Sequence, residues 1–170
     1  MTPKMMYRVK QSWQALFPRL RPADRAWLVA QNLPESAYAL FKQQSPVEQR
    51  HALDTAYSLA GLTGLNRHEQ RTLIIAALLH DCGKSTVSLH IWHRVLAVLC
   101  AMLPKHIYRQ IADGHGPLSF TLTVAVHHPE WGEKLARQAQ LSDDVCLLIR
   151  QHHNPQTKLG HLLHQADCEH

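Results

Sequence analysis

Leu78-Leu79-His80-Asp81-Cys82-Gly83-Lys84 joins the end of an apolar run to a His-Asp pair that is followed by Gly and Lys. Residues 74–77 are apolar as well, so His80 and Asp81 are predicted at the buried end of a core helix. An uncompensated carboxylate there would cost roughly 2–7 kcal/mol or more, and it therefore requires a cation or a partner. The adjacent imidazole and carboxylate also meet at one point, where a divalent metal can bind both.

Most of the chain has helical periodicity, and evidence for strands is nearly absent. Ser45-Pro46-Val47-Glu48 is a capping box that starts a helix to about Leu62. Asn66-Arg67-His68-Glu69 resembles a capping box, with Asn in place of Ser or Thr, and opens the helix that leads to the His-Asp pair. Pro129 predicts a break between two helical pieces, 118–127 and 129–140. The other expected helices are short ones after Pro22 and Pro34 and those at 9–17, 89–103, 104–113, 142–152 and 158–168.

Length and composition indicate one globular domain. A chain of 170 residues is long enough to bury a core, and an apolar fraction of 45% argues against disorder. Fourteen His are the main compositional outlier, and His is the commonest metal ligand. Residues 1–44 carry no candidate ligand, so we expect a short N-terminal helical extension there and a site-bearing domain at residues 45–170.

The charge pattern favours an anionic small molecule over nucleic acid as the partner. The formal charge is +5, but the Lys and Arg are scattered and aromatic residues make up only 6% of the chain. The four Cys lack Cys-x-x-Cys spacing, and no apolar run reaches the ~20 residues of a membrane span. We therefore expect a soluble cytoplasmic protein, whereas the oligomeric state does not follow from the sequence.

Further His and Asp residues lie at predicted helix ends or on inward-facing positions. They are His51, His128, His152, His153 and Asp167. One such residue alone is most often structural, but this many in a small domain are better explained by a shared ion. His127 is an alternative to His128 as the ligand at the Pro129 break. His161 and His164 share a face of the last helix and offer a weaker metal site, with a partly exposed face as the alternative.

This ordered series resembles the HD superfamily of metal-dependent phosphohydrolases, and more closely its HDIG and HD-GYP-like branch. The family order is His, then His-Asp, then Asp, with extra His residues between them in the dinuclear branch. The matching segments here are Arg50-His51, His80-Asp81-Cys82-Gly83-Lys84, His128-Pro129-Glu130, His152-His153 and Ala166-Asp167. The resemblance covers roughly residues 45–167 and implies an all-α HD-domain helical bundle with the N-terminal extension in front of it.

The resemblance implies a site for divalent transition metals, two in number by analogy with the dinuclear branch. The first metal would be held by His51, His80, Asp81 and Asp167, and the second by Asp81 as a bridge with His128, His152 and His153. Two metals would lower the pKa of a bridging water, and the resulting hydroxide would attack phosphorus. Fe, Mn, Zn, Co and Ni all suit such ligands, so the sequence leaves the metal and its stoichiometry open.

Three residues are candidates for contact with a substrate phosphate. Lys84 would join Asp81 in catalysis by neutralising phosphate charge or assisting the leaving group, with a solvated Lys as the alternative. The guanidinium of Arg150 matches phosphate oxygens, and a solvated Arg is the equal alternative. His115 lies in the Gly-rich segment 114–117, and loops often carry binding residues.

The expected activity is that of a phosphohydrolase or phosphodiesterase acting on a nucleotide-like or other phosphoester. Asn154-Pro155-Gln156-Thr157 follows His153 where HD-GYP proteins have a Gly-Tyr-Pro loop, so specificity for cyclic-di-GMP is not expected. The alternative is a non-catalytic regulatory module that keeps the HD fold and binds metal or nucleotide without turnover.

Overall fold

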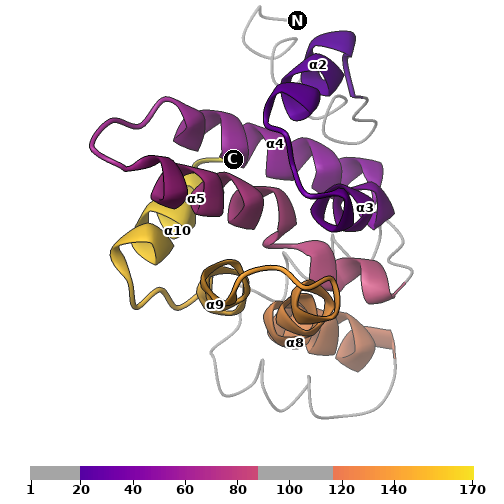
Figure 1. Ribbon diagram of the computed structural model, residues 1–170. Coiled ribbons are helices and arrows are strands. Elements are labelled where there is room, and N and C mark those ends of the chain that lie inside the picture. Colours follow the sequence, from indigo (N-terminus) through magenta and orange to yellow (C-terminus); the bar gives the residue numbers. More distant parts are fainter. Residues whose placement is uncertain (1–19, 88–116) are drawn as a thin grey trace, which may run out of the picture.

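The computed structural model describes residues 20–87 and 117–170, which form an all-α bundle without a strand among them (Figure 1). The elements are α2 (Pro22–Ala30), α3 (Glu35–Gln43), α4 (Pro46–Ala60), α5 (Arg67–Leu79), the 3₁₀ helix η1 (Cys82–Thr86), α8 (Pro117–Gln138), α9 (Asp143–Gln151) and α10 (Lys158–Glu169). The predicted all-α fold is thus confirmed. The helices expected at 9–17, 89–103 and 104–113, and His115, lie outside the described residues.

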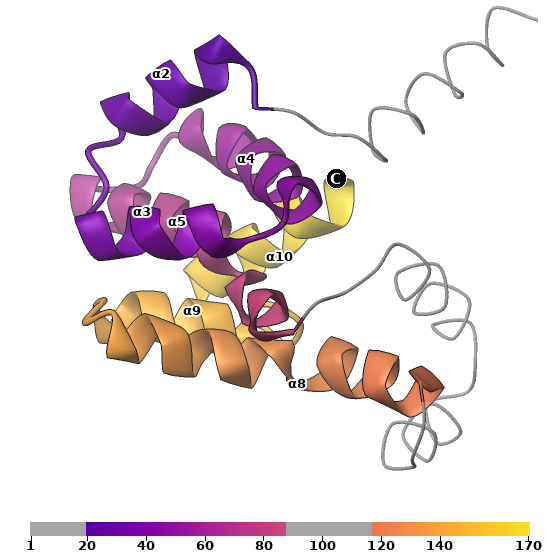
Figure 2. The ribbon, with the colours of Figure 1, turned by 90° about the vertical axis from the view of Figure 1, so that its right-hand side faces the viewer.

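Helix α5 is the central element of the bundle. Every residue from Thr72 to Leu79 is buried, so the second half of this helix is covered on all sides. Helices α3, α4, α9 and α10 all contact it, and Figures 1 and 2 show α4 and α10 beside it. Because the C-terminal end of α5 lies inside the bundle, the next two residues, His80 and Asp81, are buried too.

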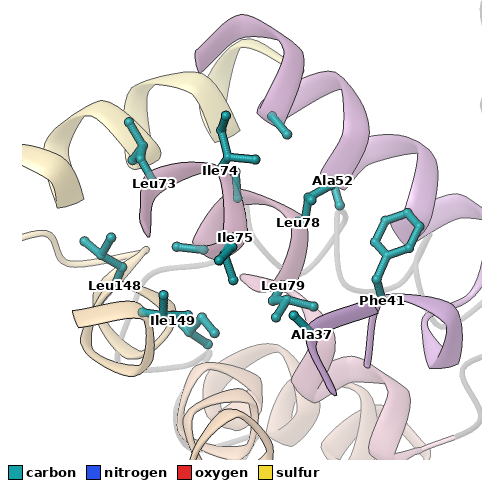
Figure 3. Close-up of a cluster of buried hydrophobic side chains, with 14 of the residues drawn as sticks. Ala37, Phe41, Ala52, Leu73, Ile74, Ile75, Leu78, Leu79, Leu148 and Ile149 are labelled. Atoms are coloured by element: carbon teal, nitrogen blue, oxygen red, sulfur yellow. The ribbon is translucent and has the colours of Figure 1, made fainter. Parts of the chain in front are cut away.

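One apolar core runs through the bundle, and its side chains come from both ends of the chain. Figure 3 shows Phe41 of α3, Leu78 of α5 and Ile149 of α9 among the buried residues of this cluster. Leu28 of α2 belongs to the same cluster. Full burial of one such side chain contributes about 1.5–3 kcal/mol. Residues before 45 therefore share the core, and the division into an extension and a domain stays a prediction.

The helix starts follow the local sequence signals. The Asn66 side chain accepts a hydrogen bond from the Glu69 backbone N–H at 2.9 Å, and the Glu69 carboxylate accepts one from the Asn66 N–H at 2.8 Å. This is the predicted capping box, and it begins α5. The hydroxyl of Ser45 caps α4 in a similar way by accepting from the Glu48 N–H.

The predicted break at Pro129 is wrong, because α8 continues through this residue as one helix. An interior Pro removes one backbone hydrogen bond and crowds the preceding turn, at a cost of about 3 kcal/mol. Contacts of α8 with η1 and α9 offset this cost. Figure 2 shows the first half of α8 extending beyond the bundle, while its second half lies against α9. None of the described helices is both long and apolar enough to cross a bilayer.

A buried carboxylate attaches α2 to α4. Asp24 is fully buried and accepts hydrogen bonds from the Arg21 backbone and guanidinium, from Arg50 at 2.7 Å and from the Tyr57 hydroxyl at 3.0 Å. Burial by itself would raise the pKa of Asp24, but these donors and the charge of Arg50 outweigh it and lower the pKa to about 2. The ionised carboxylate therefore stabilises the folded state.

Asp24→Asn is expected to lower the free energy of unfolding at pH 7 by about 1–2 kcal/mol. This figure is reduced because Arg21, one of the partners of Asp24, is exposed and solvent screens its charge. The native pKa lies below the unfolded value, so the contribution is complete above about pH 4 and is lost as the pH falls toward 2. Urea unfolding of both proteins at pH 7, 5 and 3 measures this difference.

Asp54→Asn is the matched control, because Asp54 pairs with the same Arg50 but its side chain is 39% exposed. We expect a change of less than about 1 kcal/mol for it. Equal effects of the two substitutions, or a difference that grows as the pH falls, would contradict the role given to Asp24.

Candidate metal centre

Five helix segments bring the predicted ligand residues into one cluster. His80 and Asp81 directly follow α5, His152 and His153 directly follow α9, and α4, α8 and α10 each supply one residue from within the helix. The residues of the cluster are His51, His80, Asp81, His128, His152, His153 and Asp167. Their donor atoms form two neighbouring groups, and in each group three residues offer atoms within 4.8 Å of one another.

The first group contains His51, His80 and Asp81, with Asp167 beside them. Nε2 of His51 lies 2.8 Å from Oδ1 of Asp167, and Nε2 of His80 lies 3.2 Å from the same oxygen. The two Nε2 atoms are 3.3 Å apart. Residues from α4, the end of α5 and α10 thus point their donor atoms at one small volume.

The second group contains His128, His152 and His153. Nε2 of His128 lies 3.2 Å from Nε2 of His152 and 3.3 Å from Nε2 of His153. His128 and His152 are buried, whereas His153 is exposed. This group therefore has one side that is open to solvent.

The carboxylate of Asp81 lies between the two groups. Its Oδ1 faces the second group, at 3.2 Å from Nε2 of His128 and 3.9 Å from Nε2 of His152. Its Oδ2 faces the first group, at 3.7 Å from Nε2 of His80, and also lies 2.7 Å from Nζ of Lys84. Oδ1 is buried and has no hydrogen-bond partner among the described residues.

In the first group, the carboxylates raise the pKa of an imidazole, and the imidazoles lower the pKa of the carboxylates. Burial opposes the charged form of His80, but Asp81 and Asp167 outweigh it, so the pKa of His80 lies above its usual value. Burial would raise the pKa of Asp81, yet Lys84, His80 and His128 hold it well below the usual range. Hydrogen bonds from His51 and His80 likewise lower the pKa of Asp167 against the effect of burial.

Two rings of the second group, His152 and His153, favour the neutral form. Burial and the neighbouring His80 and His153 rings lower the pKa of His152 well below its usual value. Partial burial and the facing His128 ring lower the pKa of His153 to about 4. Neutral imidazole is the form that binds metals, because only then does a ring nitrogen offer a lone pair.

Hydrogen bonds to the backbone define which nitrogen carries the proton. Nδ1 of His152 lies 2.7 Å from the carbonyl oxygen of Ile149, and Nδ1 of His128 lies 3.0 Å from that of Ala125. A carbonyl oxygen only accepts, so both contacts favour the tautomer with the proton on Nδ1, in which Nε2 carries a lone pair. In that tautomer of both rings, two lone pairs face each other across 3.2 Å, beside Oδ1 of Asp81, which has no hydrogen-bond partner among the described residues. This donor set fits a divalent metal.

The comparison with protein families agrees with this geometry. The HD domain model matches residues 49–170. The chain belongs to the HD domain family. No curated protein and no solved structure matches the chain. Members of the family are usually metal-dependent phosphohydrolases, and the His/Asp groups of this HD domain are compatible with metal binding.

The remaining predicted site residues have different surroundings. His127 is partly exposed and lies 3.5 Å from Glu130, so His128 rather than His127 faces the cluster of this HD domain. Arg150 forms an ion pair with Glu133 at 3.1 Å, and its contact with phosphate stays a prediction. Lys84 lies at the edge of the cluster with 27% of its side chain exposed.

Two residues that hold the helix ends at the cluster were not predicted from the sequence to have this role. His164 of α10 donates from Nδ1 to the carbonyl oxygen of His152 at 2.7 Å, which ties α10 to the end of α9. Gln44 is buried and donates to the carbonyl oxygen of Leu78 at 2.8 Å, at the end of α5. The spacing of His164 marked it as a weak metal site, and no sequence signal distinguished Gln44, because its partner lies 34 residues away.

Gly83 allows η1 to approach α8 closely. A Cβ atom on Gly83 would overlap the carbonyl oxygen of His128 and would lie 2.6 Å from the backbone nitrogen of Gly132. Both obstacles are backbone atoms, which cannot rotate away. A glycine is thus required where Asp81 and His128, which come from different elements, lie side by side.

Gly83→Ala is expected to destabilise the HD domain by about 1–3 kcal/mol, because η1 and α8 must separate to accommodate the methyl group. Gly61→Ala is the matched control, since a Cβ atom there meets nothing within 4 Å and its φ of −88° suits any residue. Urea unfolding of the two variants measures the difference. Equal stability of the two would contradict the close approach of η1 to α8.

Proposed function

We propose that this HD domain is a metal-dependent phosphohydrolase or phosphodiesterase that holds two divalent metals. His51, His80, Asp81 and Asp167 would hold one ion, and His128, His152, His153 and Asp81 the other. When bound, such ions neutralise charge on a phosphoryl group and lower the pKa of a water molecule that attacks phosphorus. The proposal rests on the family and on the compatibility of both groups with metal binding.

The observation that carries the proposal is the Asp81 carboxylate between the two groups. Its Oδ1 faces His128 and its Oδ2 faces His80, so one side chain has an oxygen directed at each group. A buried oxygen without a hydrogen-bond donor costs about 1–3 kcal/mol unless something positive compensates it. A shared role of Asp81 toward two cations accounts for this oxygen.

Lys84 would contact the substrate. Its ammonium group lies 2.7 Å from Oδ2 of Asp81, and the side chain reaches the surface from the buried edge of the cluster. A phosphate that approaches the cluster from solvent would meet this charge, which would neutralise a phosphoryl oxygen or stabilise the leaving group. Arg150 and His115 are further candidates for binding the rest of the substrate.

The substrate is proposed to be a nucleotide-like or other phosphoester of low molecular weight. The extra His residues, His128 and His152-His153, favour the dinuclear HDIG and HD-GYP-like branch of the family. The segment 154–157 lacks the Gly-Tyr-Pro sequence, and this argues against cyclic-di-GMP as the substrate. The formal charge of +5 suits an anionic ligand.

Asp81→Asn is expected to reduce bound metal and to lower hydrolysis by at least about 100-fold, because it removes the carboxylate charge shared by both groups. Metal content by mass spectrometry and hydrolysis of bis(p-nitrophenyl) phosphate and p-nitrophenyl phosphate are the measurements. Asp24→Asn is the matched control, since it also neutralises a buried carboxylate, but on α2.

The same assays, together with a thermal-shift screen with nucleotides, separate the enzyme from a regulatory HD module. Metal binding and stabilisation by nucleotides without product formation would favour the non-catalytic alternative. If the purified protein contains no transition metal and Asp81→Asn leaves hydrolysis unchanged, the proposed mechanism is wrong.

Lys84→Met is expected to keep the metal content and to lower kcat/KM for the phosphodiester by roughly 10–100-fold, because phosphate charge is no longer neutralised. Lys134→Met on the exposed surface of α8 is the matched control and should retain full activity. Steady-state kinetics with metal analysis on the same samples checks both. Unchanged kcat/KM in Lys84→Met would leave Lys84 as an ion-pair partner of Asp81 without a role in the reaction.

A further inference from the structure

Three buried histidines of the cluster repeat one local arrangement. In each, Nδ1 faces the carbonyl oxygen of the residue three positions earlier: His80 faces Ala77 at 2.8 Å, His152 faces Ile149 at 2.7 Å and His128 faces Ala125 at 3.0 Å. Because the carbonyl only accepts, this contact favours the tautomer with the proton on Nδ1 in all three rings. The Nε2 atoms consequently point into the cluster.

In two of the three cases, the carbonyl group that faces Nδ1 lacks a backbone N–H donor because it lies at the end of a helix. The last four carbonyl groups of a helix have no intrahelical donor. Ala77 lies in the last turn of α5, and Ile149 lies in the last turn of α9. The ring of the following His takes the place of the missing donor at both helix ends.

His128 differs, because it lies in the interior of α8. The regular donor for the Ala125 carbonyl would be the backbone N–H of residue 129, and that residue is Pro, which has none. Nδ1 of His128 is also 3.1 Å from the carbonyl oxygen of Val124, but that oxygen is the regular acceptor for the His128 backbone N–H. Ala125 is therefore the uncontested acceptor for the ring.

The other tautomer of His128 has an acceptor as well. Its Nε2 lies 3.2 Å from Oδ1 of Asp81, the buried oxygen that has no hydrogen-bond partner among the described residues. A proton on Nε2 would satisfy that oxygen and would remove the lone pair that a metal requires. Asp81 thus favours the tautomer that cannot bind metal, and the Ala125 carbonyl favours the one that can.

We propose that Pro129 is a positioning residue that keeps the proton of His128 on Nδ1 by freeing the Ala125 carbonyl, so that Nε2 of His128 is available for a metal. Pro129 thus provides, inside a helix, a carbonyl oxygen without a backbone N–H donor, which the helix ends provide for His80 and His152. This inference rests on the proposed function where it concerns metal affinity, whereas its statement about the tautomer holds without any metal.

The test uses the full chain with ¹⁵N-labelled histidine and records long-range ¹H–¹⁵N spectra, which distinguish Nδ1–H from Nε2–H rings. In the metal-free wild type, His128 is expected to be protonated on Nδ1. In Pro129→Ala, the new backbone N–H competes for the Ala125 carbonyl, and signals of the Nε2–H tautomer of His128 are expected. Pro46→Ala, at the first residue of α4, is the matched control and should leave His128 unchanged.

A zinc titration of the same samples gives the second readout. The zinc concentration that half-saturates the His152 and His153 signals is expected to rise roughly tenfold in Pro129→Ala, a usual effect of losing a hydrogen bond behind a ligand. The response of His51 and His80 should change less than that of His152 and His153.

Two results would overturn the role of Pro129. One is an Nε2–H ring at His128 in the wild type, which needs no variant to be measured. The other is a Pro129→Ala protein in which the tautomer of His128 is the same as in wild type. If the wild type binds no zinc, the proposed function fails, while the tautomer comparison still decides the role of Pro129.

Discussion

The buried carboxylate of Asp81 is the constraint on which the rest of the structure depends. It follows a helix whose second half is buried on every side, so its charge cannot be hydrated by water. Lys84 compensates Oδ2 directly, and the imidazoles of His80 and His128 lie 3.7 Å from Oδ2 and 3.2 Å from Oδ1. The end of α5, η1 and α8 must therefore lie close together, because each carries a residue that contacts this carboxylate.

Close backbone contacts make this arrangement possible. Gly83 lets η1 lie against α8, which brings Asp81 next to His128. Gln44 and His164 attach to carbonyl groups at the ends of α5 and α9, so the helix ends that carry the cluster are fixed by hydrogen bonds as well as by packing. The two groups of ligands are thus built on a rigid frame, which suits a site that must hold its donors in place.

Local sequence signals predicted helix starts correctly where the structure depends only on residues that are close in the sequence. Asn66 and Glu69 lie three residues apart and form their capping box without help from the rest of the chain. The break predicted at Pro129 is wrong for the opposite reason. The cost of this Pro to the helix is local, but the contacts of α8 with η1 and α9 that outweigh it come from distant segments. His164 and Gln44 also act through partners that are far away in the sequence.

The sequence by itself determined the helical class, the ordered series of His and Asp residues and the burial of the His80-Asp81 pair, because periodicity and spacing are written along the chain. Only the tertiary structure decided that His128 rather than His127 faces the cluster. Neighbouring residues on a helix point about 100° apart, and packing sets the rotation of the helix. The structure alone also showed the Asp81 carboxylate with one oxygen toward each group, because that arrangement depends on how five helix segments meet.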